Sequence, residues 1–552
     1  MIALLTSLAL AGPVEDAIRA ELARTEELSL PDAPPLYHVR YQLLRMEQVD
    51  LHTHLGSLVR RSTLPMNGLG VEMRVGEPDF DNTGFGGWQD GFLRTSLAAE
   101  PTAESVRLDA WRLTDRAYKQ AVEQLARKSA QFTRPPDYPG DYQLTGPTVH
   151  DGGHAEIGDA DALEALAVEL SGALVGGERT LVHGGAYVGH EAGSLWTIDT
   201  EGTDVVRPLQ ETSIRLAAQI RTDDGLLITD QRLWSVRAPT DLPPHEEMLA
   251  EATALRDQLQ AVAEAPAFGE EYVGPVVFAD TAAVDLMRYL LVPQLEGTPA
   301  EVPFDSWFGE LGSQSGSVRL ARRVLPPGWS AVDDPAGLPE HPGTFTHDYE
   351  GTPAEAVELI TDGIVQDVLM CRVPRKGVDG TNGHARGYLG SRSSGRAVSL
   401  SVSSDRHQAR TALIRRGLKL ARAYGRDHIV VIERLQEPAL LELGTNFWYD
   451  EDDLPLPPPV WATKVYADGT EEQLRGLRFA AADRWLLRDI IAAGPSVEAT
   501  WLAPAFGGWG GLGPTEGLAT RIRAAEVLVG EVELVPQSGD PMDTPIIPPP
   551  EP

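Results

Sequence analysis

The sequence contains a single cysteine, Cys371, among 552 residues. One cysteine excludes any disulfide within the chain and any zinc or iron–sulfur site built from several cysteines. Basic residues are also scarce, because 47 Lys and Arg stand against 81 Asp and Glu, a formal net charge of −34. A field of that sign repels phosphate backbones and anionic membrane surfaces, so nucleic acid is not expected as a partner.

Long apolar runs are absent beyond the first residues. No later segment has the ~18 consecutive apolar residues of a membrane-spanning helix, so no membrane span is expected. The first eleven residues are mostly apolar and end in Ala9-Leu10-Ala11. This resembles a secretory signal peptide with its cleavage site, although no Lys or Arg precedes it. We expect the mature chain to begin near Gly12 and to be exported, to the periplasm or outside the cell. The alternative is a packed N-terminal helix in a cytoplasmic protein.

The remaining composition is that of a folded chain with more than one domain, since 42% of residues are hydrophobic and the length allows sizeable cores. Helical spacing of apolar residues predicts helices at 14–27, 102–132, 161–175 and 245–265. Alternating patterns, typical of half-buried antiparallel strands, occur at 37–41, 70–75, 180–189, 195–199 and 226–235, the last runs being interrupted at 212–221. The sequence therefore predicts an N-terminal domain over 14–240 with a mixed or antiparallel sheet and long helices.

A second domain is expected over 265–535, after a Pro-rich linker at 239–244. It opens with a strand at 272–278 and a helix at 280–295. Short apolar runs between Gly and Pro then predict strands at 318–325, 363–371, 397–402, 429–433, 460–466, 474–479 and 524–534, with one helix at 408–424. The predicted fold class is α+β with two domains, the second rich in strands. The Pro-rich tail 536–552 is expected to be disordered.

Several blocks of the second half resemble one known family. They are 274–283 (Gly-Pro-Val-Val-Phe-Ala-Asp-Thr-Ala-Ala), 309–312 (Gly-Glu-Leu-Gly), 333–335 (Asp-Asp-Pro), 348–353 (Asp-Tyr-Glu-Gly-Thr-Pro) and 381–386 (Thr-Asn-Gly-His-Ala-Arg). In this order they are similar to the C-terminal domain of the TldD/PmbA (TldE) metallopeptidase-related family. The runs 465–472, 474–476 and 486–490 extend the likeness over roughly 265–535. The N-terminal half is similar more weakly, through 70–76 and 180–235.

The resemblance implies what chemistry to look for. TldD-type members carry a zinc motif, His-Glu-x-x-x-His, in the helix after the Pro-Val-Val-Phe-like strand, whereas the TldE/PmbA-type partner lacks it, and the two form halves of a closed dimer. Matching the motif's trailing Leu-Glu-Gly to 295–297 puts Arg288, Tyr289 and Pro293 at the His, Glu and His positions. None of the three can serve as a neutral zinc ligand or as a carboxylate base. The family's late cysteine has no counterpart in 505–511. The resemblance thus implies a TldE-like member without metal or cofactor.

Histidine-containing motifs offer competing interpretations. His190-Glu191 imitates the start of the zinc motif, but Leu195 stands where the second His belongs, so the end of a strand is the simpler interpretation. His245-Glu246 opens the predicted helix at 245–265 and fits a solvated first turn. The pair His52 and His54 is similar to the strand that opens an amidohydrolase β/α barrel, which would require alternating strands and helices to follow. The predicted antiparallel strands favour two surface histidines instead.

Two Gly-rich segments are further candidates for binding loops. His150 and His154 lie in a Gly-rich segment that could hold a cation, although a plain surface loop fits the same pattern. The Gly-rich run 507–513 lacks the Lys-Ser/Thr of a P-loop, so phosphate binding is not expected there.

The residues Asp348, Glu350, His384 and Arg386 lie in family blocks that resemble cleft walls. Their carboxylates and guanidinium could hold the termini of an extended peptide, or could form buried ion pairs between loops. The predicted function is a metal-free subunit of a peptide-cleaving assembly, with peptides as ligands and a homodimer or a heterodimer with a zinc-bearing family member. Two alternatives remain: a stand-alone peptide-binding protein, and an active metal-dependent hydrolase with an unrecognised site.

Overall fold

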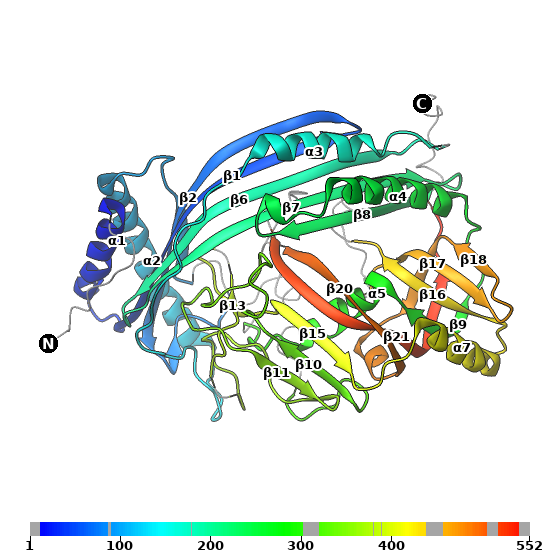
Figure 1. Cartoon of the computed structure of the whole chain (residues 1–552). Helices are drawn as coiled ribbons and strands as arrows, with labels where there is room; N and C mark the ends of the chain where they lie inside the picture. Colours follow the sequence, from blue (N-terminus) through cyan, green and yellow to red (C-terminus); the bar gives the residue numbers. More distant parts are fainter. Residues whose placement is uncertain are drawn as a thin grey trace.

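The structure is a computed structural model of the whole chain. It describes residues 12–86, 90–177, 179–301, 319–378, 380–387, 389–437, 456–504 and 517–539. Two sheets face each other in it, an N-terminal sheet of long curved strands above a C-terminal sheet (Figure 1). The predicted α+β fold with two sheet-bearing parts is confirmed.

The N-terminal sheet has eight strands in the order β3-β2-β1-β6-β7-β5, with β4 on β2 and β8 on β7. The long strands are β1 (Leu36–His54), β2 (Ser57–Glu77), β6 (His183–Asp199), β7 (Asp204–Arg221) and β8 (Leu227–Val236), and the short ones are β3 (Phe80–Asp81), β4 (Phe92–Ser96) and β5 (Val149–Asp151). All pairs are antiparallel except β5 with β7. An antiparallel sheet excludes the β/α barrel that His52 and His54 raised as an alternative.

The expected interruption at 212–221 is wrong, because these residues continue β7. Ile214, Leu216, Ala217, Ala218 and Ile220 are all buried, so both faces of the strand are covered and the apolar residues do not alternate. The runs 180–189 and 195–199 likewise belong to the single strand β6.

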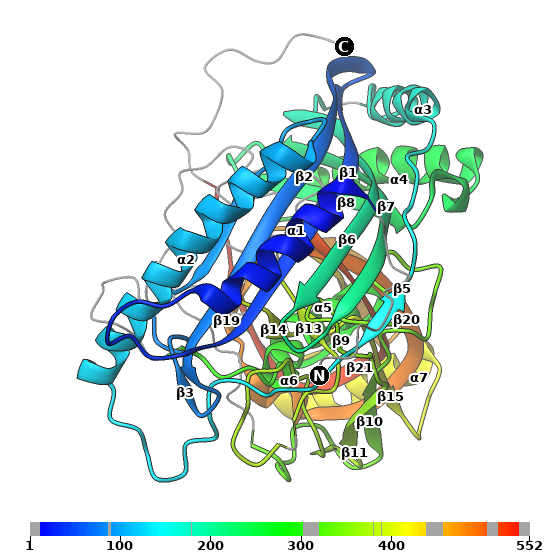
Figure 2. The same ribbon diagram turned by 90° about the vertical axis from the view of Figure 1, so that its left-hand side faces the viewer.

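Four helices cover one face of this sheet, in two pairs (Figure 2). The first pair, α1 (Pro13–Arg24) and α2 (Ala103–Gln131), packs on Val39, Tyr41 and Leu43 of β1. The second pair, α3 (Ala160–Gly172) and α4 (His245–Glu264), packs farther along β1 on Val49 and Leu51. Since side chains alternate along a strand, the even-numbered residues of β1 point to the opposite face. Short 3₁₀ turns, η1 (Thr25–Glu27) and η2 (Pro239–Asp241), end α1 and precede α4.

Over the described residues, the C-terminal sheet has eleven strands in the order β12-β11-β10-β15-β21-β9-β16-β17-β18, with β19 and β20 also on β21. Their bounds are β9 (Tyr272–Phe278), β10 (Trp329–Asp333), β11 (Val357–Thr361), β12 (Ile364–Val365), β15 (Ser399–Ser404), β16 (His428–Leu435), β17 (Pro459–Tyr466), β18 (Glu471–Leu474), β19 (Leu477–Ala481), β20 (Ile490–Pro504) and β21 (Gly517–Pro536). A separate ribbon pairs β13 (Ala385–Arg386) with β14 (Ser394–Gly395). The pairs β15–β21 and β9–β16 are parallel, so the sheet is mixed.

Several predicted elements of this half differ in the structure. The expected strand 318–325 has, over its described residues, only an isolated bridge from Arg323 to Ile364, and the expected strand 474–479 is divided between β18 and β19. The expected strand 363–371 ends at Val365, and the buried residues Val368 to Cys371 form a loop whose backbone bonds to other loops, for example Leu369 N to Leu295 O at 2.8 Å. The expected helix 280–295 is two helices, α5 (Asp280–Leu290) and α6 (Val292–Leu295), with Pro293 in the first turn of the second. Proline lacks the N–H that a continuous helix needs there.

The remaining helical segments are α7 (Arg410–Ala421), η4 (Arg422–Tyr424) and η5 (Arg484–Leu487). Within the described residues, no helix combines the length and the apolar character needed to cross a membrane. The predicted leader 1–11, the blocks 309–312 and 505–513, and tail residues 540–552 lie outside the described residues. The expected tail starts in the fold, because Pro536 ends β21 and Gln537 N donates to Gly476 O at 2.8 Å.

Candidate functional site

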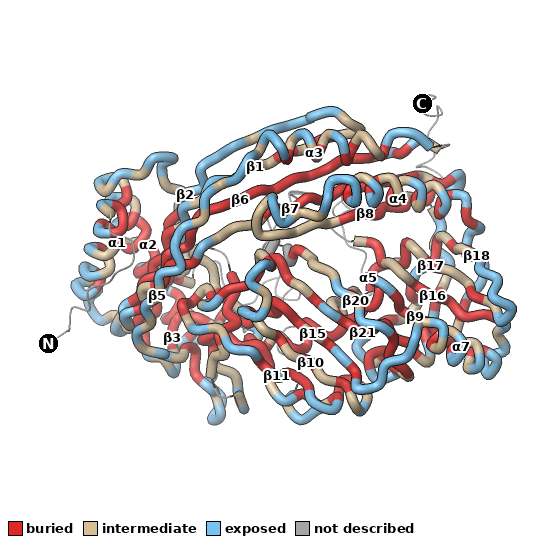
Figure 3. Tube along the Cα trace, in the orientation of Figure 1, coloured by how far each residue is buried: buried red, intermediate tan, exposed pale blue. Residues whose placement is uncertain are grey.

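The face of the N-terminal sheet that carries no helices is directed at the C-terminal sheet, and both facing surfaces are largely buried (Figure 3). Strand register sets rows of side chains across β1, β6 and β7 on this face. The rows are Leu44–Leu195–Arg207, Gln48–Glu191–Glu211 and His52–Tyr187–Arg215. The face is therefore unusually polar for the interior of a protein, and its functional groups meet those of the C-terminal half.

A large cavity of about 690 Å³ lies between this face and the C-terminal half. Its walls come from β7, β8, α5, β20 and the loop around His341, and include Arg215, Trp234, Arg288 and Trp501. The helix α5 is held in place because Ala283, Leu286, Met287 and Leu290 are buried in the C-terminal core. The same helical spacing directs Asp285 and Arg288 toward the cavity.

Arg288, the residue that the family resemblance matches to the first His of the zinc motif, is a firmly held charge of the large cavity. Its guanidinium donates from Nη1 to Glu437 Oε2 at 2.7 Å and from Nη2 to Glu437 Oε1 at 3.1 Å. It also lies 3.7 Å from Asp285 Oδ1 and stacks on the rings of Trp501 and Tyr289, 4.4 and 4.7 Å from their centroids. A two-point ion pair between aromatic rings fixes this side chain firmly.

The electrostatics of the Arg288 cluster do not suit a metal cation. Burial opposes the charge of Arg288, but the Glu437 carboxylate outweighs it and raises the pKa of Arg288 above its ordinary value. Burial raises the pKa of Asp285 to about 7, despite the neighbouring guanidinium. A zinc ion needs neutral imidazoles or carboxylates, whereas Arg288, Tyr289 and Pro293 offer a permanent positive charge, a phenol and no donor. The residues at the motif position therefore do not fit zinc.

A second, small cavity of about 180 Å³ adjoins the large one. Glu211 lines the small cavity, and Ser235, which lines the large one, donates to it from Oγ at 3.1 Å. The other walls include Arg207, Tyr349 and Arg386. Arg386 is thus the one predicted site residue that lines either cavity.

Two of the four predicted site residues, Asp348 and His384, hold loops together within the C-terminal half. Asp348 Oδ1 accepts from the backbone N–H groups of Glu350 and Thr352 at 2.9 Å, and its Oδ2 accepts from Ala385 N at 3.0 Å. His384 is fully buried, and its Nε2 lies 3.2 Å from Asp333 Oδ1. These bonds bring the family blocks 333–335, 348–353 and 381–386 together. A peptide-binding role for the four residues stays a prediction.

Glu350 belongs to a buried ionic network that joins the two halves of the chain. Its Oε2 accepts from Arg372 N at 2.7 Å, and its Oε1 lies 3.6 Å from Arg40 of β1. Arg40 donates to Glu72 at 2.7 Å, and Arg74 pairs with Glu72 and Asp81. Although burial opposes it, Arg40 and Arg74 lower the pKa of Glu72 to about 2. The sequence raised buried ion pairs between loops as one role for Glu350, but no pattern indicated its partners Arg40 and Arg372, which are distant from it or carry no motif.

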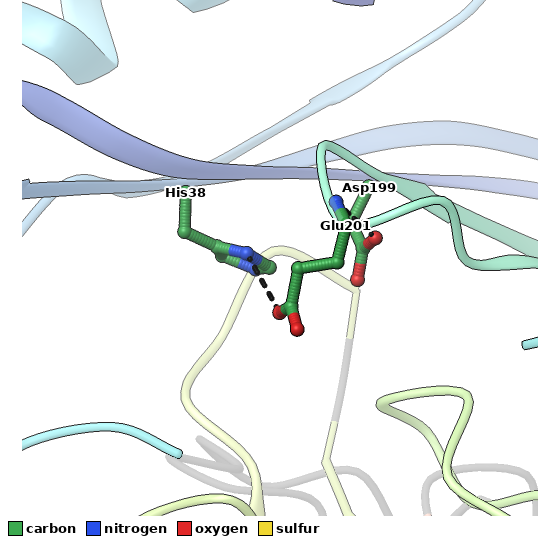
Figure 4. A group of neighbouring side chains, drawn as sticks. All are labelled: His38, Asp199 and Glu201. Atoms are coloured by element: carbon green, nitrogen blue, oxygen red, sulfur yellow. Dashed lines mark hydrogen bonds and ion pairs between the residues drawn. The ribbon is translucent and has the colours of Figure 1, made fainter. Parts of the chain in front are cut away.

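Arg372 also contacts a group that has the composition of a metal site, His38, Asp199 and Glu201 (Figure 4). His38 Nδ1 lies 3.3 Å from Glu201 Oε1, and the possible ligand atoms of the three lie within 4.8 Å of one another. However, the fully buried Arg372 pairs with Asp199 at 3.5 Å and with Glu201. Its guanidinium supplies the positive charge that a cation would otherwise provide, so we interpret the group as part of the ionic network.

The other histidines of the sequence analysis are spread over the molecule. His52 lies two residues before His54, the end of β1, and stacks on Tyr187 with ring centroids 4.4 Å apart, whereas His190 lies in the middle of β6 and not at a strand end. His150 stacks on His347 at 4.3 Å, and His154 Nδ1 lies 3.0 Å from Ser194 Oγ. His245 is half-exposed in the first turn of α4 and pairs with Glu169 at 2.9 Å. Within the described residues, the His38 group alone places three possible metal ligands together.

Comparison with known proteins finds a matching domain model and solved structures of similar fold. Residues 270–429 match the model of the PmbA/TldA metallopeptidase C-terminal domain. A solved Thermotoga maritima structure, described as a proposed modulator of a DNA gyrase, is 15% identical with a TM-score of 0.58, over 94% of this chain and 100% of that one. TldE from Thermococcus kodakarensis is 13% identical with a TM-score of 0.54, over 95% and 100% of the two chains.

A third solved structure, from Bacteroides thetaiotaomicron and also described as a proposed modulator of DNA gyrase, is 12% identical with a TM-score of 0.56, over 95% and 98% of the two chains. No curated protein sequence matches the chain. At these identities the solved structures establish the shared fold, and the match at 270–429 establishes the kind of C-terminal domain. The resemblance found in the sequence is thereby confirmed: residues 270–429 match the PmbA/TldA C-terminal domain, and the chain shares its fold with TldE and the two gyrase-modulator structures.

Proposed function

We propose that this chain is a metal-free, TldE-like subunit of a peptide-cleaving assembly whose zinc is carried by a partner of the same family. The observation that carries the proposal is the ion pair between Arg288 and Glu437 at 2.7 and 3.1 Å. It occupies the place on α5 where the resemblance locates the first zinc ligand. Removing one partner of such a buried pair would leave the other charged and uncompensated, so the pair is a built feature of the fold.

The backbone supports the same proposal. α5 ends at Leu290 and α6 begins at Val292, so the helix is interrupted between the positions that correspond to the two His ligands. Restoring His and Glu at 288 and 289 would therefore not rebuild the motif, since the third position is Pro293. The subunit contributes walls and charges around a peptide, while the hydrolytic water is activated elsewhere.

The large cavity gives this role a physical basis. Its volume of about 690 Å³ lies in the range of ligand pockets and accommodates a few residues of an extended chain. Both charge signs line it, among them Arg215, Arg232, Glu251 and Asp285. A peptide, which carries amide groups and charges of both signs, suits such a surface better than an apolar ligand does.

In the test, the purified chain is first used to capture the family member that carries His-Glu-x-x-x-His from the native extract. The chain alone is then compared with the chain to which this partner has been added. We expect no stoichiometric zinc by metal analysis, no cleavage of an unstructured peptide by the chain alone, and cleavage once the partner is added. Cleavage by the pure chain that a chelator stops, and that Arg288→Ala with Tyr289→Ala leaves intact, would reveal a different active site. If no zinc-bearing partner is captured and peptides still bind, the stand-alone peptide-binding alternative replaces this proposal.

Export of the chain is part of the proposal and is independent of the cavities. The described fold begins with α1 at Pro13, where Val14, Ala17 and Ile18 are buried against α2. Cleavage near Gly12 would therefore leave these contacts intact. Mass analysis of the native protein should show a mature N-terminus near Gly12. An intact Met1 would contradict export and favour the cytoplasmic alternative.

A further inference from the structure

Arg207 of β7 lines the small cavity and is buried without an ionic partner. Its side chain is 7% exposed, and its Nε and Nη1 atoms have no hydrogen-bond partner. Its guanidinium stacks on the rings of Tyr349 and Phe345, 4.2 and 4.8 Å from their centroids. Nothing in the described part of the chain pairs with its charge. The side chain is thus held in position by its stem and by ring stacking, while its donors remain available.

Two further arginines line the same cavity, Arg237 and Arg386. Arg386 donates to Ala397 O, Thr520 Oγ1 and Ala519 O at 2.8 to 2.9 Å, and Arg237 donates to the carbonyl groups of His341 and Thr344 and to Thr344 Oγ1 at 3.2 to 3.4 Å. These acceptors are neutral, and among the described residues neither guanidinium forms an ion pair. Burial lowers the pKa of both side chains, and the charge of Arg207 lowers it further.

The acids of the small cavity do not neutralise these charges. Glu191 and Glu211 lie directly opposite each other on β6 and β7. Burial and the neighbouring Glu211 raise the pKa of Glu191, and burial raises that of Glu211. Glu211 accepts a hydrogen bond from Ser235 and forms no ion pair with a described arginine. Because an arginine cannot release its proton, the cavity keeps an excess of positive charge around neutral pH.

An uncompensated buried charge is costly, and the buried Arg207 and Arg386 and the half-buried Arg237 around one cavity also repel one another. A ligand anion removes both costs at once, and a planar carboxylate matches the fork of a guanidinium better than other small groups do. We propose that the small cavity binds the carboxylate of a small ligand, the C-terminal carboxylate of a short peptide, through Arg207 with Arg237 and Arg386 around it.

The remaining walls fit the end of a peptide. Leu44, Leu195 and Leu209 form an apolar side next to Arg207, which suits an aliphatic side chain beside the carboxylate. The volume of about 180 Å³ admits one terminal residue, and the adjoining large cavity receives the residues before it. The identity of the ligand as a peptide rests on the proposed function, whereas the carboxylate site depends neither on a partner nor on catalysis.

The experiment uses the full chain without any partner. Binding of N-acetyl-Ala-Ala-Ala with a free carboxylate is measured by calorimetry and compared with binding of its C-terminal amide and of inorganic phosphate. We expect the free acid to bind at least tenfold more tightly than the amide, and Arg207→Met to abolish that difference. Arg207→Lys keeps the charge but loses the fork, so it should retain part of the preference and serves if the Met variant does not fold.

The matched control is Arg61→Met, which removes an exposed arginine that pairs with Asp161 and Glu164. It should leave the preference unchanged. Equal binding of acid and amide, or tighter binding of phosphate than of the free acid, overturns the assignment. A preserved acid preference together with a failure to cleave in the presence of any partner would sustain this site and refute the proposed function.

Discussion

Two groups of arginines lie between the N-terminal sheet and the C-terminal half and differ in one respect. Arg40, Arg74 and Arg372 each pair with carboxylates, in the network through Glu72, Glu350 and Glu201. Arg207, Arg237 and Arg386, around the small cavity, form no ion pair with any described residue. The first group binds the two halves of the chain to each other. The charges of the second group have no carboxylate partner among the described residues, so an anionic ligand could pair with them.

The largest expected difference between the two groups is the effect of their substitution on the free energy of unfolding. Arg372→Met should lower the free energy of unfolding by about 3 to 5 kcal/mol, because Asp199 and Glu201 would stay buried without their partner. Denaturant unfolding followed by circular dichroism measures this loss. Arg61→Met, on the surface, should leave the unfolding curve unchanged. A loss for Arg372→Met no larger than that of the surface control would show that the network does not join the two halves.

The acids of the small cavity predict an unusual pH dependence. Burial and the neighbouring Glu211 raise the pKa of Glu191 to about 8, so the folded protein holds a proton at pH 6 that the unfolded chain, whose carboxyl has its ordinary pKa of 4.5, has released. This stabilisation is complete below the ordinary pKa of 4.5 and is lost as the pH rises through the folded pKa, about 3 kcal/mol of it between pH 6 and pH 9.

Glu191→Gln, which is neutral in the folded and unfolded states, should therefore raise the free energy of unfolding by about 2 kcal/mol at pH 6 and by about 3 kcal/mol more at pH 9. The control is Glu47→Gln, an exposed residue of β1 on the other face of the sheet. Thermal unfolding of both variants at the two pH values measures the difference, and an equal shift at both would contradict the proton linkage.

Arg207→Met should change the free energy of unfolding in the opposite direction from Arg372→Met, or leave it unchanged. Removing an unpaired buried charge while keeping the aliphatic stem should leave the stability without ligand unchanged or raise it by about 1 to 2 kcal/mol. The same denaturant experiment measures it. A loss comparable with that of Arg372→Met would mean that Arg207 is a structural residue and that the two groups do not differ.

The smallest expected effect concerns Cys371, which lies next to Arg372 and is buried with Val373 and Ala385. Burial raises the pKa of its thiol to about 11, which keeps it protonated and unreactive. Cys371→Ala should cost about 1 kcal/mol of stability and leave an ordered protein. Loss of a bound metal or cofactor in this variant would contradict its structural role.

The sequence predicts those elements of the fold whose apolar pattern and boundaries lie within the segment itself. Helices at 102–132 and 245–265 were predicted within a residue or two of α2 and α4, because amphipathic spacing and Pro or Gly boundaries lie within the segments themselves. The strand continuity of 212–221 and the loop at 366–371 were missed, since residues buried on all sides look alike in sequence whether they belong to a strand, a helix or a loop.

The site shows the same limit. Arg288 was identified at the motif position through the family resemblance, but its partner Glu437 is 149 residues away and no pattern links them. Arg207 carries no motif at all. Its importance depends on which face of β7 it occupies and on which rings cover it, and both follow from strand register and from the packing of the two sheets.

The place of β21 in the C-terminal sheet bears on the order in which the chain can fold during synthesis. The N-terminal sheet pairs neighbours in sequence, β1 with β2, β6 with β7 and β7 with β8. In contrast, β21 is the last strand and bonds to β9, β15, β19 and β20, with Val527 opposite Phe278. The first sheet can form while the ribosome still works, whereas the second stays without its central strand until translation is nearly complete. Premature termination before residue 517 would consequently leave a nascent product with an intact first sheet and an exposed apolar second half.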